Sequence, residues 1–377
     1  MTVTHGTLAA GDGHVGARTL RTAVVGAGFM GRVHAESARR AGGRVVAVTA
    51  SSPVGADAAA AAVGADRGYP DLEALLSDAQ VDVLHVCAPN SAHAGIAETA
   101  LAAGVHVICE KPLATSVADA TALVAASAGR IATVPFVYRF HPMVREMRAR
   151  LAGGEAGIVS SVSGSYLQDW LAGEADHDWR VDPALGGPSR AFADIGSHWC
   201  DLVEFATGDR IARLSAQTVV VHERTGAAHE HITTEDIATV QFTTARGVVG
   251  ILVVSQVAAG RKNRLHLEVS GTEASFGFDQ EDPERLWVGR RAGSTVLLRD
   301  PGTLSPGAAR YARLPAGHAQ GYQDCFDAFV TDTYRAVLGE DPADGLPTFA
   351  DGLRAVRITD AVLRSAAAGG AWTEVPA

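Results

Sequence analysis

The sequence predicts an α/β protein in which a doubly wound parallel sheet is followed by a second domain with a mostly antiparallel sheet. Strand-like and helix-like segments alternate between residues 22 and 137, which is typical of a parallel sheet with helices on both faces. Beyond about residue 140, longer strand-like runs follow one another and are joined by turns such as 244–247, which favours antiparallel pairing. The length of 377 residues suits two domains.

The elements of the first half are expected where apolar runs meet local start and stop signals. Asp71 and Ser116 are residues that cap the start of a helix, and Gly104 and Gly129 are typical of helix ends. The predicted strands are 22–26, 44–50, 81–87, 105–109 and 131–137. The predicted helices are 30–41, 56–63, 71–77, 93–103 and 117–128. Ligands of such a sheet bind beyond the carboxyl ends of its strands.

The second half begins with a predicted helix at 143–151. Its predicted strands are 158–168, 212–222, 236–243, 248–255, 264–270 and 286–288. Further helices are predicted at 196–206, 320–338 and 349–368. The last of these helices is free to pack back on the first domain.

Composition and charge exclude several classes of protein. Hydrophobic residues make up 47% and charged residues 20%, as in soluble globular proteins. The net charge of −10 disfavours nucleic acid or an anionic membrane as the main partner, and no apolar run is long enough to span a membrane. The four cysteines form no CxxC pair, so neither a zinc cluster nor a disulfide framework is expected, and a cytoplasmic location fits. Residues 1–19 resemble a flexible tail, because they lack the apolar core of a signal peptide.

A glycine motif predicts where a dinucleotide binds. An apolar, β-branched run leads into Gly26-x-Gly28-x-x-Gly31, and a helical pattern follows. Gly26 allows a tight turn, Gly28 lets the backbone approach a pyrophosphate, and Gly31 lets the helix press on the strand. Phe29 and Met30 lie inside the motif and belong to the expected coenzyme site. The start of the helix would hold the pyrophosphate through its free N–H groups.

The end of the second strand bears on the choice between NAD and NADP. An acid often stands there to bind the adenosine ribose, but this strand ends in Ala50-Ser51-Ser52. Ser51 and Ser52 could donate hydrogen bonds to a 2′-phosphate, which an aspartate would repel. They could equally form a plain polar turn before Pro53. The expected coenzyme is NAD or NADP, with a slight preference for NADP.

Polar residues also follow the third and fourth strands. Ala88-Pro89-Asn90 and the nearby His93 are expected to face the coenzyme, although Asn90 could instead cap a helix. Glu110 and Lys111 precede a proline that favours an extended backbone. Lys111 would then project over the carboxyl edge of the sheet and polarise a substrate oxygen there. The alternative is an ordinary solvated lysine.

Asp194 and His198 stand four residues apart at the start of a predicted helix. At this spacing the two side chains can meet on one helix face. A carboxylate can orient a histidine that exchanges protons near neutral pH. Alternatively, Asp194 caps the helix and His198 packs in the core. The residues alone leave both interpretations open.

These motifs together resemble one family. The pairing of Glu-Lys-Pro at 110–112 with the Asp-to-His spacing of Asp194 and His198 is similar to the glucose–fructose oxidoreductase, inositol dehydrogenase and MocA (Gfo/Idh/MocA) family. The resemblance extends from about residue 20 to the end of the chain. The segments that carry it are 26–34, 85–94, 110–114, 179–188, 194–202 and 271–279.

The resemblance implies a Rossmann domain at 20–140 and, at 141–377, an α/β domain with a large open sheet for substrate binding and oligomerisation. It implies a tightly held NAD(H) or NADP(H), and it implies Lys111, Asp194 and His198 as the catalytic group. The substrates typical of the family are sugars, cyclitols and related polyols. The open sheet of the family commonly packs on another subunit, so a homodimer or homotetramer is expected.

Further site residues are expected around this group. Tyr138 and Arg139 end the strand that begins near residue 131, and Arg139 is expected to touch nicotinamide or substrate. Tyr166 is expected at the substrate. Trp179 and Arg180 are expected to close over the coenzyme, although Trp179 could simply pack in the core.

The resulting hypothesis is an NAD(P)-dependent oxidoreductase of a sugar, cyclitol or sugar derivative. His198 takes the hydroxyl proton, Lys111 stabilises the developing alkoxide, and Asp194 positions His198 or binds a neighbouring hydroxyl. Lys111 and His198 could exchange these roles. Two alternatives are a redox-neutral enzyme that cleaves glycosides with bound NAD, and a non-catalytic regulatory protein that binds a dinucleotide. No metal is expected, because His222, His229 and His231 match no usual ligand spacing.

Overall fold

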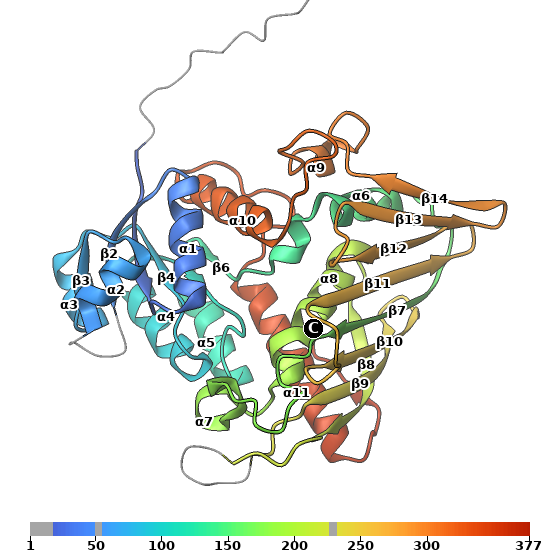
Figure 1. Cartoon of the computed structure of the whole chain (residues 1–377), viewed down its shortest axis with the longest axis horizontal. Coiled ribbons are helices and arrows are strands. Elements are labelled where there is room, and N and C mark those ends of the chain that lie inside the picture. The colour runs from blue at the N-terminus through green and yellow to red at the C-terminus, as the bar shows by residue number, and fades with distance from the viewer. Residues whose placement is uncertain (1–17, 50–54, 226–231) are drawn as a thin grey trace, which may run out of the picture.

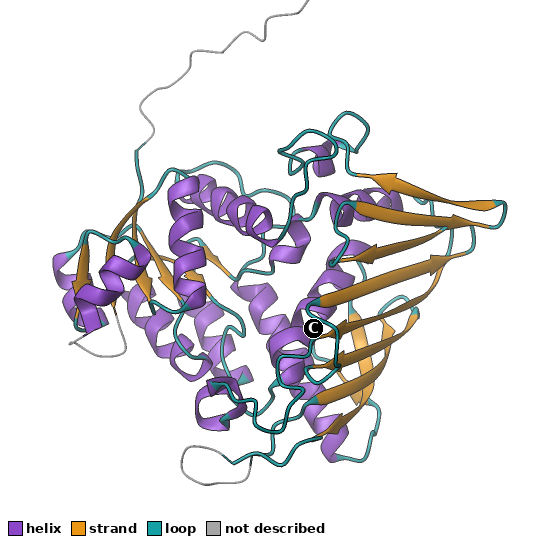
Figure 2. Cartoon of the chain, in the orientation of Figure 1, coloured by secondary structure: helices purple, strands orange, loops and turns teal. Residues whose placement is uncertain are grey.

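The computed structural model describes residues 18–49, 55–225 and 232–377 (Figure 1). Within this part of the chain, the strands form two separate sheets, and helices fill the space between the sheets (Figure 2). The first sheet is parallel and the second is mostly antiparallel, which confirms the predicted fold class.

The first sheet has the strand order β3-β2-β1-β4-β5-β6, and every pair is parallel. Its strands are β1 (Arg21–Val25), β2 (Arg44–Thr49), β3 (Arg67–Tyr69), β4 (Val83–Val86), β5 (His106–Cys109) and β6 (Ala132–Thr133). Its helices are α1 (Phe29–Arg40), α2 (Ala56–Val63), α3 (Leu72–Asp78), α4 (His93–Ala102) and α5 (Val117–Ala126), with a short 3₁₀ turn η2 (Asn90–Ala92) before α4. The strand order reverses between β1 and β4, and this is where such sheets bind their ligands.

One predicted strand of this sheet is wrong over most of its length. The strand expected at 131–137 is only the two residues of β6, and a 3₁₀ turn, η3 (Val137–Phe140), follows. Pro135 explains the difference, because proline has no N–H to donate to a sheet. Just before it, the backbone N–H of Val134 already leaves the sheet and donates to the carbonyl of Pro347 at 3.2 Å.

The second sheet has nine strands in the order β14-β13-β12-β11-β7-β10-β9-β8-β15. Its strands are β7 (Val159–Leu167), β8 (Ile211–Val219), β9 (Ile237–Thr244), β10 (Val249–Ser255), β11 (Arg264–Gly271), β12 (Ser275–Asp279), β13 (Arg285–Arg290), β14 (Gly293–Leu298) and β15 (Thr373–Glu374). Only β7 and β10 run parallel to each other. The strands β12, β14 and β15 are not among those predicted from the sequence.

The helices of the second half join the two sheets. They are α6 (Pro142–Ala152), α7 (Pro183–Gly186), α8 (Ser197–Thr207), α9 (Pro306–Ala309), α10 (Tyr322–Val337) and α11 (Phe349–Ala367), with a 3₁₀ turn η4 (Trp179–Val181) and a π-helical turn η5 (Phe192–Gly196). Helix α10 lies against α1 (Figure 1). Helix α11 places Phe349 and Leu353 in the core of the first sheet, and Ile358 and Val362 in the core of the second. Among the described helices, none combines the length and apolarity needed to cross a membrane.

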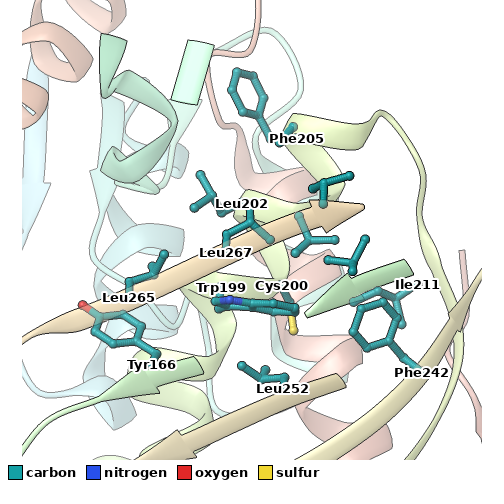
Figure 3. Packing of buried hydrophobic residues seen from close by; sticks show 14 of the residues in the cluster. Tyr166, Trp199, Cys200, Leu202, Phe205, Ile211, Phe242, Leu252, Leu265 and Leu267 are labelled. Carbon is teal, nitrogen blue, oxygen red and sulfur yellow. The ribbon is translucent and has the colours of Figure 1, made fainter. Parts of the chain in front are cut away.

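Helix α8 is anchored in the core of the second sheet through Trp199 (Figure 3). The Trp199 ring is fully buried, and its Nε1–H donates to the carbonyl of His266 in β11 at 2.8 Å. Aliphatic side chains of the sheet, such as Leu252 and Leu267, surround the ring. A buried tryptophan with a satisfied N–H has little freedom to move, so the preceding residue, His198, has a fixed position.

A buried ionic cluster ties the start of β9 to the segment before η5. The Asp236 carboxylate accepts hydrogen bonds from the guanidinium groups of Arg190 and Arg224, and all three side chains are almost fully buried. The neighbouring Glu235 accepts hydrogen bonds from the backbone N–H groups of Arg190 and Phe192 at 3.0 and 2.9 Å. The two carboxylates therefore hold the backbone that leads to Asp194.

We predict that Asp236→Ala lowers the stability of the fold by about 3–5 kcal/mol, because two buried guanidinium groups lose their shared carboxylate. Asp360→Ala removes an exposed i,i+4 pair with Arg364 and should change stability by less than about 0.5 kcal/mol. Thermal unfolding of both variants measures the difference. Equal melting temperatures for the two variants would contradict the structural importance of the cluster.

Candidate active site

A cavity of about 1050 Å³ lies at the carboxyl ends of β1, β4 and β5. One wall comes from the first sheet and its loops, and the other comes from the second half of the chain. The second half contributes Tyr166, Gln168, Asp178, Trp179, Arg180, Asp194, Ile195, His198, Asn263, Tyr322 and Phe326, and Tyr138 reaches the cavity from the turn η3 after β6. The site is therefore assembled from segments that are far apart in the sequence.

The three glycines of the motif have different surroundings. Gly26 has a φ of +99°, and a Cβ there would lie 2.5 Å from the carbonyl oxygen of Cys87. A Cβ on Gly31 would lie 1.9 Å from the carbonyl oxygen of Gly26, so helix α1 contacts the turn directly. A Cβ on Gly28 would meet nothing within 4 Å. Gly28 lines the cavity at the start of α1, where free N–H groups attract an anion.

The other predicted residues of this wall also line the cavity. They are Phe29, Met30, Ala88, Pro89, Asn90, His93 and Glu110. Asn90 does not cap a helix, since its side-chain amide donates to the carbonyl of Gly186 in α7 at 2.9 Å. The ring nitrogens of His93 lie 2.8 and 2.7 Å from the carbonyl oxygens of Ala88 and Pro112, so this ring joins the loops after β4 and β5.

Lys111 and Asp194 meet inside the cavity. The Nζ of Lys111, after β5, donates to the Oδ1 of Asp194 at 2.6 Å and to the backbone carbonyl of the same residue at 2.8 Å. Both side chains are less than a fifth exposed. This ion pair joins the first sheet to the second half of the chain and directs the lysine into the cavity rather than to bulk solvent.

Two further residues hold the Asp194 carboxylate. The side-chain amide of Gln256, at the end of β10, donates to its Oδ2 at 2.8 Å, and the Nε of Arg180 lies 3.7 Å from its Oδ1. Burial alone would raise the pKa of Asp194, but the charges of Lys111 and Arg180 lower it to about 2. The carboxylate is therefore ionised at any physiological pH. The contact of Gln256 with Asp194 is not predicted from the sequence, because no local motif contains Gln256.

One interpretation left open by the sequence, a contact between Asp194 and His198 on one helix face, is wrong. Asp194 lies in the π-helical turn η5, and its carboxylate bonds Lys111 and Gln256 instead of the imidazole. A π turn is wider than an α turn, so residues four apart no longer lie one above the other. Among the described residues, the Nδ1 of His198 has no hydrogen-bond partner. Asp194 therefore orients the lysine rather than the histidine.

His198 is held by packing and is neutral. Its ring makes edge-to-face contacts with Phe136 and Tyr138, with centroids 5.7 and 5.0 Å apart. Burial and the nearby charge of Lys111 lower the pKa of His198 to about 3. The imidazole is thus neutral at physiological pH.

The wall opposite the glycine loop carries a network of neutral side chains. The hydroxyl of Tyr138 lies 2.5 Å from that of Tyr166, which donates to the Oδ1 of Asn263 at 2.8 Å. The amide of Gln168 donates to the same oxygen at 2.8 Å. Gln168 and Asn263 meet because β7 and β11 are antiparallel neighbours that pair Leu167 with Arg264. The sequence analysis missed both residues, because only strand register brings them together.

Trp179 and Arg180 line the cavity from η4. The guanidinium of Arg180 lies 4.4 Å from the centre of the Trp179 ring, and its Nη1 lies 3.1 Å from Asp178. Trp179 is partly exposed and so is not a simple core residue. The pair lies beside the Lys111–Asp194 contact, because the Nε of Arg180 is 3.7 Å from the Oδ1 of Asp194.

The prediction that Arg139 touches nicotinamide or substrate is wrong, because Arg139 does not line this cavity. Its guanidinium is buried and bonds the carboxylates of Asp201 and Asp351, the latter at 2.8 Å. The 3₁₀ turn that replaces the predicted strand directs consecutive side chains to different sides, so Tyr138 faces the cavity and Arg139 faces away. Ser51 and Ser52 lie outside the described residues.

Of the three histidines considered for a metal, His229 and His231 lie outside the described residues. The ring of His222 bonds the carbonyl of Ala172 at 2.9 Å. Among the residues that the structure describes, no group of three histidine, cysteine or acidic side chains is arranged to hold a metal ion.

Fold and site together define a dinucleotide-binding oxidoreductase. Residues 20–136 match the family described as "Oxidoreductase family, NAD-binding Rossmann fold", and residues 144–277 match the "GFO/IDH/MocA C-terminal domain". The chain belongs to the Gfo/Idh/MocA family, which confirms the resemblance inferred from its motifs.

Several sugar and cyclitol dehydrogenases are similar to this chain. Levoglucosan dehydrogenase of Pseudarthrobacter phenanthrenivorans is 29% identical and covers 95% of this chain and 99% of its own. A structure of levoglucosan dehydrogenase in complex with NADH and levoglucosan has a TM-score of 0.88 at 27% identity, covering 95% of this chain and 100% of its own. Inositol 2-dehydrogenase of Rhizobium meliloti is 27% identical and covers 93% of this chain and 97% of its own.

Two glycine substitutions should separate binding from folding. Gly28→Ala adds a methyl group in open space, so the protein should fold normally but bind NADH about tenfold more weakly or worse, because the methyl group blocks the approach of the pyrophosphate. Gly31→Ala forces a clash with backbone and should cost about 1–3 kcal/mol of stability. Calorimetry with NADH and thermal unfolding measure the two effects. Unchanged NADH affinity in Gly28→Ala would contradict the assigned site.

Proposed function

We propose that the protein is an NAD(P)-dependent dehydrogenase of a sugar, cyclitol or sugar derivative. One observation carries the proposal: Lys111, Asp194 and His198 reach the same cavity as the glycine loop of the dinucleotide fold. The similarity to levoglucosan and inositol dehydrogenases over nearly the whole chain supports the same substrate class. The neutral hydrogen-bonding wall of Tyr166, Gln168 and Asn263 suits an uncharged polyol.

The three residues have separate tasks in the oxidation of a carbinol. A bound oxidised nicotinamide supplies the hydride acceptor for the carbinol carbon. The ammonium group of Lys111 stabilises negative charge that develops on the carbinol oxygen. His198, neutral at physiological pH, accepts the hydroxyl proton at a ring nitrogen. Asp194 is a positioning residue, because it fixes the lysine through a 2.6 Å hydrogen bond.

The residues present fit a dinucleotide coenzyme. The open space at Gly28 and the start of α1 suit a pyrophosphate, and the loops after β4 and β5 line the path from there to Lys111. NADH bound to the related levoglucosan dehydrogenase supports NAD(H). The slight preference for NADP rests on Ser51 and Ser52 alone, so an assay must include both coenzymes.

We predict that a panel of neutral sugars and cyclitols, including levoglucosan and myo-inositol, contains a substrate that reduces NAD⁺ or NADP⁺. Lys111→Met should lower kcat/KM for that substrate about 100- to 10,000-fold, because the alkoxide loses its only adjacent ammonium group among the described residues. Absorbance of the reduced nicotinamide measures both rates.

Two outcomes would contradict this proposal. Turnover that survives in Lys111→Met would exclude the assigned catalytic lysine. Release of phenol from aryl glycosides without added coenzyme and without net reduction would instead identify the redox-neutral, glycoside-cleaving reaction.

We further propose that the open face of the second sheet joins two copies of the chain in a homodimer or homotetramer. Alternate residues of β10 face outward, and Val249, Ile251 and Val253 are 56%, 54% and 41% exposed. Val296 and Leu298 of β14 add to this apolar face. The four cysteines are free thiols, which suits the cytoplasmic location that we also propose.

Ile251→Lys should convert the oligomer to a smaller species, because it places a charge in the middle of the proposed contact. Light scattering on the eluted protein measures the mass. Leu338→Lys is the matched control, since Leu338 is an exposed apolar residue just after α10, away from the sheet. A monomeric parent protein, or equal masses for both variants, would contradict this interface.

A further inference from the structure

A chain of buried polar side chains runs from the interior of the first domain to the cavity. Thr22, His34, His85 and Tyr334 are all at most 2% exposed, and the chain ends at Glu110, which lines the cavity. The contacts are Thr22 Oγ1 to Tyr334 Oη at 2.5 Å, Tyr334 Oη to His85 Nε2 at 3.0 Å, His85 Nδ1 to His34 Nδ1 at 2.9 Å, and His34 Nε2 to Glu110 Oε1 at 3.0 Å.

The direction of these hydrogen bonds follows from the chemistry of the groups. An ionised Glu110 only accepts, so His34 carries its proton on Nε2. With both imidazoles neutral, the Nδ1 of His34 accepts from His85, and the Nε2 of His85 accepts from Tyr334. Every donor in the chain then points toward Glu110, and such aligned bonds polarise one another. The backbone N–H of Lys111 donates to the other carboxylate oxygen at 3.0 Å.

The chain explains how a buried carboxylate remains charged. Burial alone would raise the pKa of Glu110, but its hydrogen bond and electrostatic interaction with His34, followed by the charge of Lys111, lower it. Burial also lowers the pKa of His85 well below its usual value, so that ring is neutral.

The charges around the cavity single out Glu110. Three carboxylates and two cations line the cavity: Glu110, Asp178 and Asp194 against Lys111 and Arg180. Lys111 bonds Asp194, and Arg180 bonds Asp178. Among the described residues, the hydrogen-bond partners of the Glu110 carboxylate are the imidazole of His34 and the backbone N–H of Lys111. Counted over acidic and basic side chains, with histidines taken as neutral, the cavity lining carries one excess negative formal charge, and Glu110 is the carboxylate without a lysine or arginine hydrogen-bond partner among the described residues.

We propose that the ionised carboxylate of Glu110 raises the affinity of this cavity for the oxidised coenzyme relative to its affinity for the reduced coenzyme. The row of hydrogen bonds from Thr22 through Tyr334, His85 and His34 holds that carboxylate in place. An oxidised nicotinamide ring is a cation, whereas a reduced ring is neutral. A carboxylate near that ring attracts only the oxidised form. His34, His85 and Tyr334 are therefore positioning residues that act through Glu110. The inference rests on the proposed function, because it assumes a nicotinamide in this cavity.

Equilibrium binding of NAD⁺ and NADH, and of NADP⁺ and NADPH, to the whole protein of 377 residues tests this inference without catalysis. Glu110→Gln keeps the shape of the side chain and removes its charge. The affinity for the oxidised form relative to the reduced form should fall about tenfold, the effect of one charge at about 10 Å in a partly screened site. Tyr334→Phe, at the remote end of the chain, should lower the same ratio about two- to threefold.

Tyr311→Phe is the matched control. Like Tyr334→Phe, it removes a buried tyrosine hydroxyl from the same hydrophobic cluster. The hydroxyl of Tyr311 donates to Asp332 at 2.7 Å and takes no part in the hydrogen-bonded row that leads to Glu110. The ratio should be unchanged in this variant, whereas a general loss of stability would affect both tyrosine variants alike. If Glu110→Gln does not fold, the comparison of Tyr334→Phe with Tyr311→Phe decides.

The outcomes separate this inference from the proposed function. If the parent protein binds coenzyme and Glu110→Gln leaves the ratio of oxidised to reduced affinity unchanged, the inference is wrong but the proposed dehydrogenase function is not contradicted. The same holds for an unchanged ratio in Tyr334→Phe if Glu110→Gln does not fold. If the parent protein binds none of the four coenzymes, both fall.

Discussion

The ion pair between Lys111 and Asp194 is the interaction on which the site depends. The two residues are 83 positions apart, one at the end of a strand of the parallel sheet and the other in a turn that the second sheet supports. Each charge alone would be costly in this half-enclosed setting, so the pair is stable only when the segments that follow β5 and precede α8 are both in place. The reacting group therefore exists only in the complete fold.

The surrounding structure secures both ends of this pair. On one side, Glu110 and His93 fix the loop that carries the lysine. On the other, Glu235 holds the backbone before η5, and Gln256 holds the carboxylate itself. Helix α11 reaches both hydrophobic cores and so limits movement of one sheet against the other. Buried polar contacts of this kind make a site rigid before any ligand arrives.

Sequence patterns were sufficient where structure is local. The alternating apolar runs predicted five of the six strands of the first sheet, although 131–137 is too long because Pro135 interrupts the strand. Features that depend on distant residues were not predictable in the same way. The π turn at Asp194 breaks the helical spacing on which the contact with His198 was based, and Arg139 lies on the far side of a turn that was expected to be a strand. Gln168 and Asn263 become neighbours only through the pairing of β7 with β11.

The most direct test of this account is a crystal structure of the protein with a reduced nicotinamide coenzyme and a polyol that it oxidises. The account predicts that the pyrophosphate lies over Gly28 and that the reacting hydroxyl lies within hydrogen-bond distance of both Lys111 Nζ and His198. A polyol bound in the cavity with its reacting hydroxyl remote from Lys111, or a coenzyme bound outside the cavity, would contradict it.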